Sequence, residues 1–190
     1  MNSLNHRQQF FIGLVLVAVV AVTRFNHFGS PLSLPDASLA VFFLAGFYLT
    51  RWIWFPIIIV EAGLMDWASI SGGVSDWCVT AAYGFLIPAY ACPWFAGRWY
   101  ASRARKVWAT IMPFAGALGL GIVGAFAISN GSFYLFSGYF DSLGWTGYMR
   151  GVIGYFPGYA GYTILYVAVA GCIHGIVVAL PERFRLIARA

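Results

Sequence analysis

The chain has 190 residues, of which 61% are hydrophobic and only 9% are charged, and its formal net charge is +5. Soluble domains carry charge on about a quarter of their residues, so this composition excludes an ordinary soluble enzyme. The basic residues stand in short stretches between apolar runs, which argues against a nucleic-acid-binding patch. We therefore expect an all-α integral membrane protein, a single domain over residues 1–190 embedded in the lipid bilayer.

Six apolar segments predict a bundle of six transmembrane helices. The second and third are shorter than the roughly 20 residues that a perpendicular span needs, and only Thr50 and Arg51 separate them, so we expect a tight helical hairpin. The sixth is long enough to tilt, or to kink at Pro157. The segments are Phe10–Thr23, Ser38–Leu49, Trp52–Met65, Cys78–Ala96, Trp108–Ser129 and Gly151–Leu180.

The basic residues predict the orientation of these spans. If the N-terminus is cytoplasmic, only Arg24 and Arg150 face outward, and this asymmetry predicts that both termini lie in the cytoplasm, at the inner (cytoplasmic) membrane. If the first segment were a cleaved signal peptide, five spans would remain and the basic residues would no longer gather on one side of the membrane. The inward-facing residues are Arg7, Arg51, Arg98, Arg103, Arg105, Lys106, Arg183, Arg185 and Arg189.

Small residues at four-residue spacing predict where helices approach closely. Three such residues lie on the fifth segment, and two pairs lie on the sixth. They are Ala117, Gly121 and Ala125, then Gly154 with Gly158 and Gly171 with Gly175.

Polar side chains gather at the predicted outer end of the bundle. Ionisable groups at the bilayer edge are costly, so this group is a candidate functional site. Its members are His27, Asp66, Cys78, Tyr83 and Arg150.

Three further acids have plainer interpretations. We expect Asp36 and Asp76 to cap the helices that follow them. Glu61, within the third span, is either a structural glutamate, protonated or hydrogen-bonded, or part of a proton relay. The structural interpretation is favoured because no second carboxylate follows at helical spacing.

Cys78 is the strongest single candidate for a functional residue. If Asp76 is the cap, Cys78 falls in the first helical turn, where free N–H groups and the helix dipole favour a thiolate. Cys92 would lie about 21 Å deeper along the same helix. A free cysteine is more often a small buried hydrophobe, but a thiolate is also a soft ligand for a metal that arrives inside a bound molecule.

Three stretches carry a family resemblance: Thr23–Pro31 (Thr-Arg-Phe-Asn-His-Phe-Gly-Ser-Pro), Glu61–Trp67 (Glu-Ala-Gly-Leu-Met-Asp-Trp) and Ser75–Gly84 (Ser-Asp-Trp-Cys-Val-Thr-Ala-Ala-Tyr-Gly). With its length and span pattern, the chain resembles the substrate-binding S-components of energy-coupling-factor (ECF) vitamin transporters. It looks most like the BtuM family of solitary, cobalamin-specific S-components. The most specific feature is Cys78 in its Asp-Trp-Cys context.

The resemblance implies an S-component-like bundle that captures cobalamin from the outer side, under a roof of loops, and transports it inward. Cobalamin is then the substrate, and no protein-held metal ion is implied. Cys78 matches the family cysteine expected to ligate the cobalt, a contact associated with loss of cyanide from cyanocobalamin. The family's surrounding polar positions fall on His27, Asp66, Tyr83 and Arg150.

One departure concerns the partner. S-components that dock on a shared ECF energising module commonly carry Ala-x-x-x-Ala on the first helix, whereas Gly13, Ala18 and Ala21 do not make that spacing. The chain's use of such a module therefore stays open, as does the question of whether decyanation makes it an enzyme. Two alternatives remain: an S-component for another vitamin, and a non-transporting membrane subunit.

Overall fold

The computed structural model describes residues 4–24, 34–103 and 111–179, and over these ranges it contains helices and no strand. The protein is an all-α membrane bundle, as the composition predicts. The elements are α1 (His6–Arg24), α2 (Ser38–Tyr48), α3 (Trp54–Ser71), the 3-10 helix η1 (Ala81–Phe85), α4 (Leu86–Arg103), α5 (Ile111–Phe136), α6 (Trp145–Val152), the 3-10 turn η3 (Ile153–Tyr155) and α7 (Phe156–Ala179).

Four of the described helical stretches are long and apolar enough to cross a membrane. They are α1, α3, α5 and the continuous run from α6 to α7. The hairpin predicted around Thr50 and Arg51 is present, because α2 ends at Tyr48 and α3 begins at Trp54. The fourth helix differs from its predicted bounds: it begins at Ala81 as a 3-10 turn and continues as α4 to Arg103.

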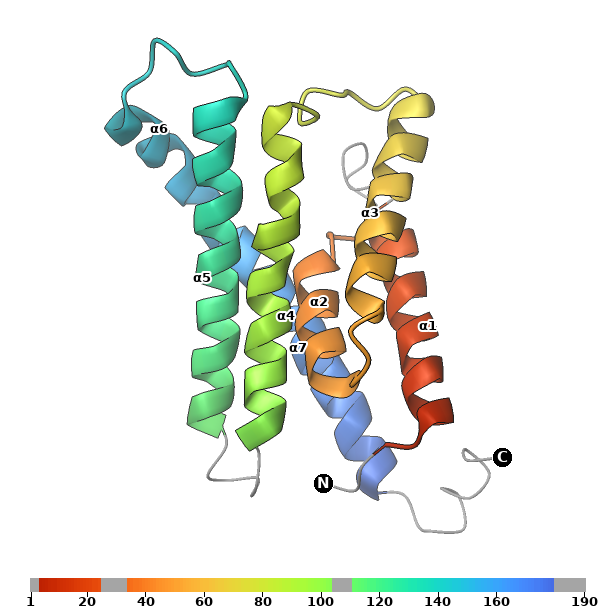
Figure 1. The fold of residues 1–190 in the computed structure, drawn as a ribbon. Coiled ribbons are helices and arrows are strands. Elements are labelled where there is room, and N and C mark those ends of the chain that lie inside the picture. Colours follow the sequence, from red (N-terminus) through yellow and green to blue (C-terminus); the bar gives the residue numbers. More distant parts are fainter. Residues whose placement is uncertain (1–3, 25–33, 104–110, 180–190) are drawn as a thin grey trace.

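The short helix α2 lies at the centre of the bundle, and every residue from Ser38 to Gly46 is buried. A helix that is apolar all round is stable only when other helices surround it. In Figure 1, α4 and α5 lie on one side of α2, α3 and α1 lie on the other, and α7 passes behind. By contrast, Thr163 and Val167 are the buried residues of α7, which therefore presents most of its surface to lipid.

Helices α2 and α4 approach each other through two glycines. A Cβ atom on Gly46 would overlap the carbonyl oxygen of Trp94, and one on Gly97 would overlap the carbonyl oxygen of Phe43. Only the absence of side chains at these positions permits this approach, which is how small residues bring membrane helices together.

The predicted small-residue faces have different outcomes. On α5, Ala117, Gly121 and Ala125 are buried, and a Cβ on Gly121 would lie 2.9 Å from the Cα of Pro93, so this face packs against α4 as predicted. On α7, Gly171 has no heavy atom of another described segment within 4 Å of an added Cβ, and neither has Gly175. The prediction of a packed interface there is wrong for the described chain.

The sixth predicted segment contains a short 3-10 turn close to Pro157. The turn η3 separates α6 from α7, and Pro157 is the second residue of α7. A proline in the first helical turn costs no intrahelical hydrogen bond, but it disfavours helical continuation from the residues before it.

Helix lengths make the two ends of the bundle different. We call "upper end" the end that carries the α3–η1 loop (72–80) and the α5–α6 loop (137–144), as Figure 1 is drawn. The described parts of α1 and α2 stop short of the level that α3, α4 and α5 reach there (Figure 1). The start of α1 and the end of α7 lie together at the opposite end, as an even number of passes requires.

Candidate functional site

The last residue of α1, Arg24, points into the bundle and is only 4% exposed. Its Nε donates to Asp66 Oδ1 and its Nη2 donates to Asp66 Oδ2, each at 2.7 Å. This two-point geometry suits a planar guanidinium and gives the strongest form of a charged hydrogen bond. It ties the end of α1 to α3.

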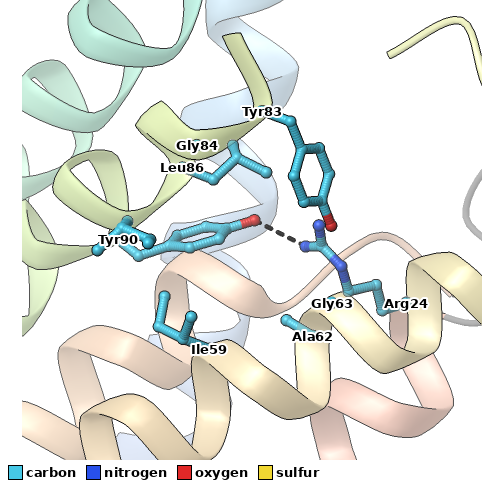
Figure 2. Close-up of a pocket in the computed structure, with 9 residues that line it drawn as sticks. Arg24, Ile59, Ala62, Gly63, Tyr83, Gly84, Leu86 and Tyr90 are labelled. Carbon is cyan, nitrogen blue, oxygen red and sulfur yellow. Dashed lines mark hydrogen bonds between the residues drawn. The ribbon is translucent and has the colours of Figure 1, made fainter. Parts of the chain in front are cut away.

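The remaining donor group of Arg24 serves the neighbouring helices. Nη1 donates to the Tyr90 hydroxyl at 2.7 Å, a contact drawn in Figure 2, and to the Ser38 hydroxyl at 3.0 Å. Asp36 Oδ2 lies 3.3 Å from the same nitrogen. One buried cation therefore joins α1, the start of α2, α3 and α4.

Tyr83 completes the arrangement by donating its hydroxyl hydrogen to Asp66 Oδ2 at 2.6 Å. Asp66 thus accepts three short hydrogen bonds, two from Arg24 and one from Tyr83. A buried carboxylate is tolerated only when it is satisfied in this way. We call this group the Arg24 cluster; it consists of Arg24, Asp36, Ser38, Asp66, Tyr83 and Tyr90.

A small cavity of about 120 Å³ adjoins the cluster, between α3 on one side and η1 and α4 on the other. Figure 2 shows Tyr83, Tyr90 and Arg24 around it, with Ile59 and Leu86 among its apolar walls. Pockets for small organic ligands usually measure about 300–1,000 Å³, so this cavity is too small for a large ligand.

Cys78 is exposed and lies in a turn of the α3–η1 loop, outside any helix. The cap of the following helix is Thr80, whose hydroxyl accepts the Ala82 N–H at 3.2 Å. The predictions that Asp76 caps this helix and that Cys78 occupies its first turn are therefore wrong. Two residues lie between Cys78 and the start of η1, and a threonine fills the capping role instead.

The surroundings of Cys78 also act against a preformed thiolate. Desolvation of the sulfur, and then the nearby Asp66 carboxylate, raise the pKa of the Cys78 thiol above its ordinary value. A cysteine gains a low pKa from cations or a helix N-terminus, whereas the influences from the described residues on Cys78 act in the opposite direction.

The other predicted site residues are placed as follows. Asp66 and Tyr83 lie together in the Arg24 cluster. Arg150 is exposed on α6, and no hydrogen bond or ion pair joins it to that cluster within the described ranges. His27 lies outside the described residues.

Two acids outside the predicted site also have clear positions. Asp36 is not the N-cap of α2, which is Ala37, but it lies one residue before the cap, where its Oδ1 accepts the Ser38 N–H at 2.9 Å, and it contacts Arg24 as well. Both carboxyl oxygens of Glu61 are buried and have no hydrogen-bond partner among the described residues. No hydrogen bond to the Glu61 side chain is therefore found in the described part of the chain, and a protonated structural glutamate and a proton relay both stay predictions.

Sequence reasoning missed Arg24, Tyr90 and Ser38. The charge pattern predicts only that Arg24 faces outward, although this residue directly follows an apolar span. An arginine in that position, with Asp36 and Asp66 predicted at the same end, is the signal that would have revealed the ion pair. Nothing in the local sequence marks Tyr90.

No group of three or more His, Cys, Asp or Glu residues that could hold a metal ion occurs in the described part of the chain. Comparison with known proteins found no matching family model and no matching curated protein.

Proposed function

We propose that this protein binds cobalamin at the upper end of the bundle and transports it inward, with Cys78 as the ligand to cobalt. The observation that carries the proposal is the position of Cys78. A free, exposed cysteine lies in a loop beside the charged Arg24 cluster, at one end of an otherwise apolar bundle. The choice of cobalamin rests on the resemblance of this cysteine and its Asp-Trp-Cys context to the BtuM family.

Aromatic side chains next to Cys78 in the sequence and their neighbours support a large, flat ligand. Trp77 precedes Cys78, and its ring packs against Phe133 on α5 and Tyr139 in the α5–α6 loop; Phe140 packs against Phe133 in turn. Such rings provide broad apolar contact surfaces with little loss of conformational entropy. A corrin ring needs both a surface of this kind and one metal donor.

The small size of the cavity limits the positions that a corrin could occupy. At about 120 Å³ the cavity beneath the loops is too small for a corrin. The corrin would therefore lie above it, between the two loops of the upper end. In this arrangement Asp66 and Tyr83 form the floor of the site, since their polar atoms are already hydrogen-bonded within the Arg24 cluster.

The chemistry assigned to Cys78 is a ligand exchange that leaves the oxidation state of cobalt unchanged. The thiol loses its proton, and the sulfur lone pair forms the bond to cobalt as the axial group on that face leaves with its own electron pair. A strong donor on one axial face weakens the bond on the other, so cyanide leaves with its electron pair and takes up a proton as hydrogen cyanide. A coordinating metal deprotonates a thiol, which makes a preformed thiolate unnecessary.

The test is the absorption spectrum of the purified protein with cyanocobalamin. The parent should give a changed corrinoid spectrum and release cyanide, because sulfur replaces one axial ligand. Cys78→Ser and Cys78→Ala should lose both signals, whereas the matched controls Cys92→Ala and Cys172→Ala should keep them. Cyanide release by Cys78→Ala at the parent rate would exclude the thiol mechanism. A parent that binds another vitamin, or none, would favour one of the alternative functions.

We further propose that the upper end faces outward, with both termini in the cytoplasm at the cytoplasmic membrane. The positions of the basic residues support this orientation. A C-terminal reporter fusion should be active only in its cytoplasmic form; activity of an extracellular reporter would reverse the orientation. Uptake by vesicles that contain this protein alone would exclude a requirement for an ECF module.

A further inference from the structure

We propose that Trp77 and Tyr139 are positioning residues for Cys78, because their ring stack ties the α3–η1 loop to the α5–α6 loop. The role of this stack in cobalt ligation rests on the proposed function. The stack itself lies within this protein, so its effect on Cys78 can be tested without cobalamin.

The contact between the two loops has two parts. The rings of Trp77 and Tyr139 stack with centroids 5.0 Å apart and planes at 6°. The hydroxyl of Tyr139 also donates to the carbonyl oxygen of Trp77 at 3.2 Å. That carbonyl belongs to the planar peptide unit that leads into Cys78. Tyr139 therefore fixes both the side chain and the backbone of the residue before the cysteine.

The stack is anchored on a rigid element. The ring of Phe133, on α5, meets Trp77 edge-on at 5.0 Å and Tyr139 edge-on at 5.9 Å. Three aromatic rings, from a helix and from both loops, thus form one group.

The backbone of the α5–α6 loop directs Tyr139 toward this group. Gly138 has a φ of 77°, in the left-handed region that side chains disfavour. The hydroxyl of Ser137 accepts the Tyr139 N–H at 3.3 Å. A tight turn therefore presents the tyrosine to the opposite loop.

On the other side of Cys78 the chain is held by its own turn. The Val79 N–H donates to the backbone carbonyl oxygen of Asp76 at 2.7 Å, and the Thr80 N–H donates to the backbone carbonyl oxygen of Cys78 at 3.2 Å. The cysteine thus lies between a local turn and the stack. Because Trp77 and Tyr139 are about half exposed, at 51% and 47%, the stack can be removed without opening the core of the bundle.

The experiment measures the alkylation rate of Cys78 by a maleimide in the full chain, with no ligand, at one neutral pH. Cys92→Ala and Cys172→Ala form the background, so that Cys78 is the one thiol. Trp77→Ala and Tyr139→Ala should raise the rate by about three- to tenfold, because loss of the stack frees the α3–η1 loop and exposes the sulfur to the reagent more often.

Three further variants sharpen the result. Tyr139→Phe and Trp77→Phe keep a ring in the stack and should react more slowly than the corresponding alanine variants. Tyr162→Ala is the matched control, because Tyr162 lies on α7 and is 49% exposed, close to the value for Tyr139. It should react at the parent rate.

Equal alkylation rates for the parent, Trp77→Ala and Tyr139→Ala would overturn the proposal. An equal rise with Tyr162→Ala would overturn it too, because the effect would then be general. If Trp77→Ala is not recovered as folded protein, Tyr139→Ala decides the outcome alone. A parent that fails to bind cobalamin refutes the proposed function and leaves this result unaffected, so the two failures are distinguishable.

Discussion

Arg24 and Asp66 are 42 residues apart in the sequence, yet each of two guanidinium nitrogens lies 2.7 Å from a separate carboxylate oxygen. Both side chains are nearly inaccessible, at 5% and 7% exposure. The pair joins the end of α1 to α3 directly beneath the proposed site. We expect it to stabilise the upper end of the bundle.

Removal of one partner should therefore be costly. Arg24→Ala leaves the Asp66 carboxylate buried without its cation, and it should lower the free energy of unfolding by about 3–5 kcal/mol. Denaturant unfolding in detergent measures this. Arg103→Ala is the control, because Arg103 is exposed over the Trp99 ring, and its change should stay within about 0.5 kcal/mol. Equal stability of Arg24→Ala and the parent would contradict a stabilising role for the pair.

The close contact of α2 with α4 predicts opposite results for two glycine substitutions. Gly97→Ala places a methyl group against the carbonyl oxygen of Phe43, so it should destabilise the protein by about 1–3 kcal/mol. Gly171→Ala is the matched control, since no heavy atom of another described segment lies within 4 Å of its added Cβ. It should be neutral or slightly stabilising because alanine favours a helix. Similar melting temperatures for both variants would be incompatible with this packing.

The raised pKa of Cys78 predicts how cobalt ligation depends on pH. The thiol must release a proton when sulfur binds cobalt, so below the thiol pKa the apparent affinity should rise with pH, by up to tenfold per unit. The dependence should flatten only at alkaline pH, above the ordinary cysteine range. Titration of the spectral change at several pH values checks this. In Cys78→Ser the slope should vanish; an unchanged slope would assign the proton to another group.

Arg150 and Asp66 should affect binding in different ways. Arg150 is exposed and has no hydrogen-bond or ion-pair partner in the described chain, so Arg150→Ala should weaken cobalamin binding several-fold and leave the melting temperature unchanged. Asp66→Asn removes an acceptor shared by Arg24 and Tyr83, so it should lower the melting temperature as well. Calorimetry and thermal unfolding separate the two effects. Parent-like affinity of Arg150→Ala would remove Arg150 from the site.

The sequence determined the helical segments and part of their packing. Apolar runs are visible among neighbouring residues, and α1, α2 and α5 overlap their predicted ranges. A kink at Pro157 was one of two possibilities for the sixth segment, and the structure has the turn η3 beside this residue. The buried face of α5 followed from residue spacing alone. These features depend on local composition and helix geometry, which a sequence records directly.

Only the tertiary structure decided which polar residues meet. The contact of Arg24 with Asp66 and Tyr90 depends on the depth and rotation of three helices, and these follow from close approaches such as that of Gly46 to Trp94. The position of Cys78 depends on which residue caps the next helix, and in the structure this cap is Thr80 and not Asp76. These outcomes depend on contacts between segments that are far apart in the sequence. Such contacts form only when the helices pack, so the local sequence does not reveal them.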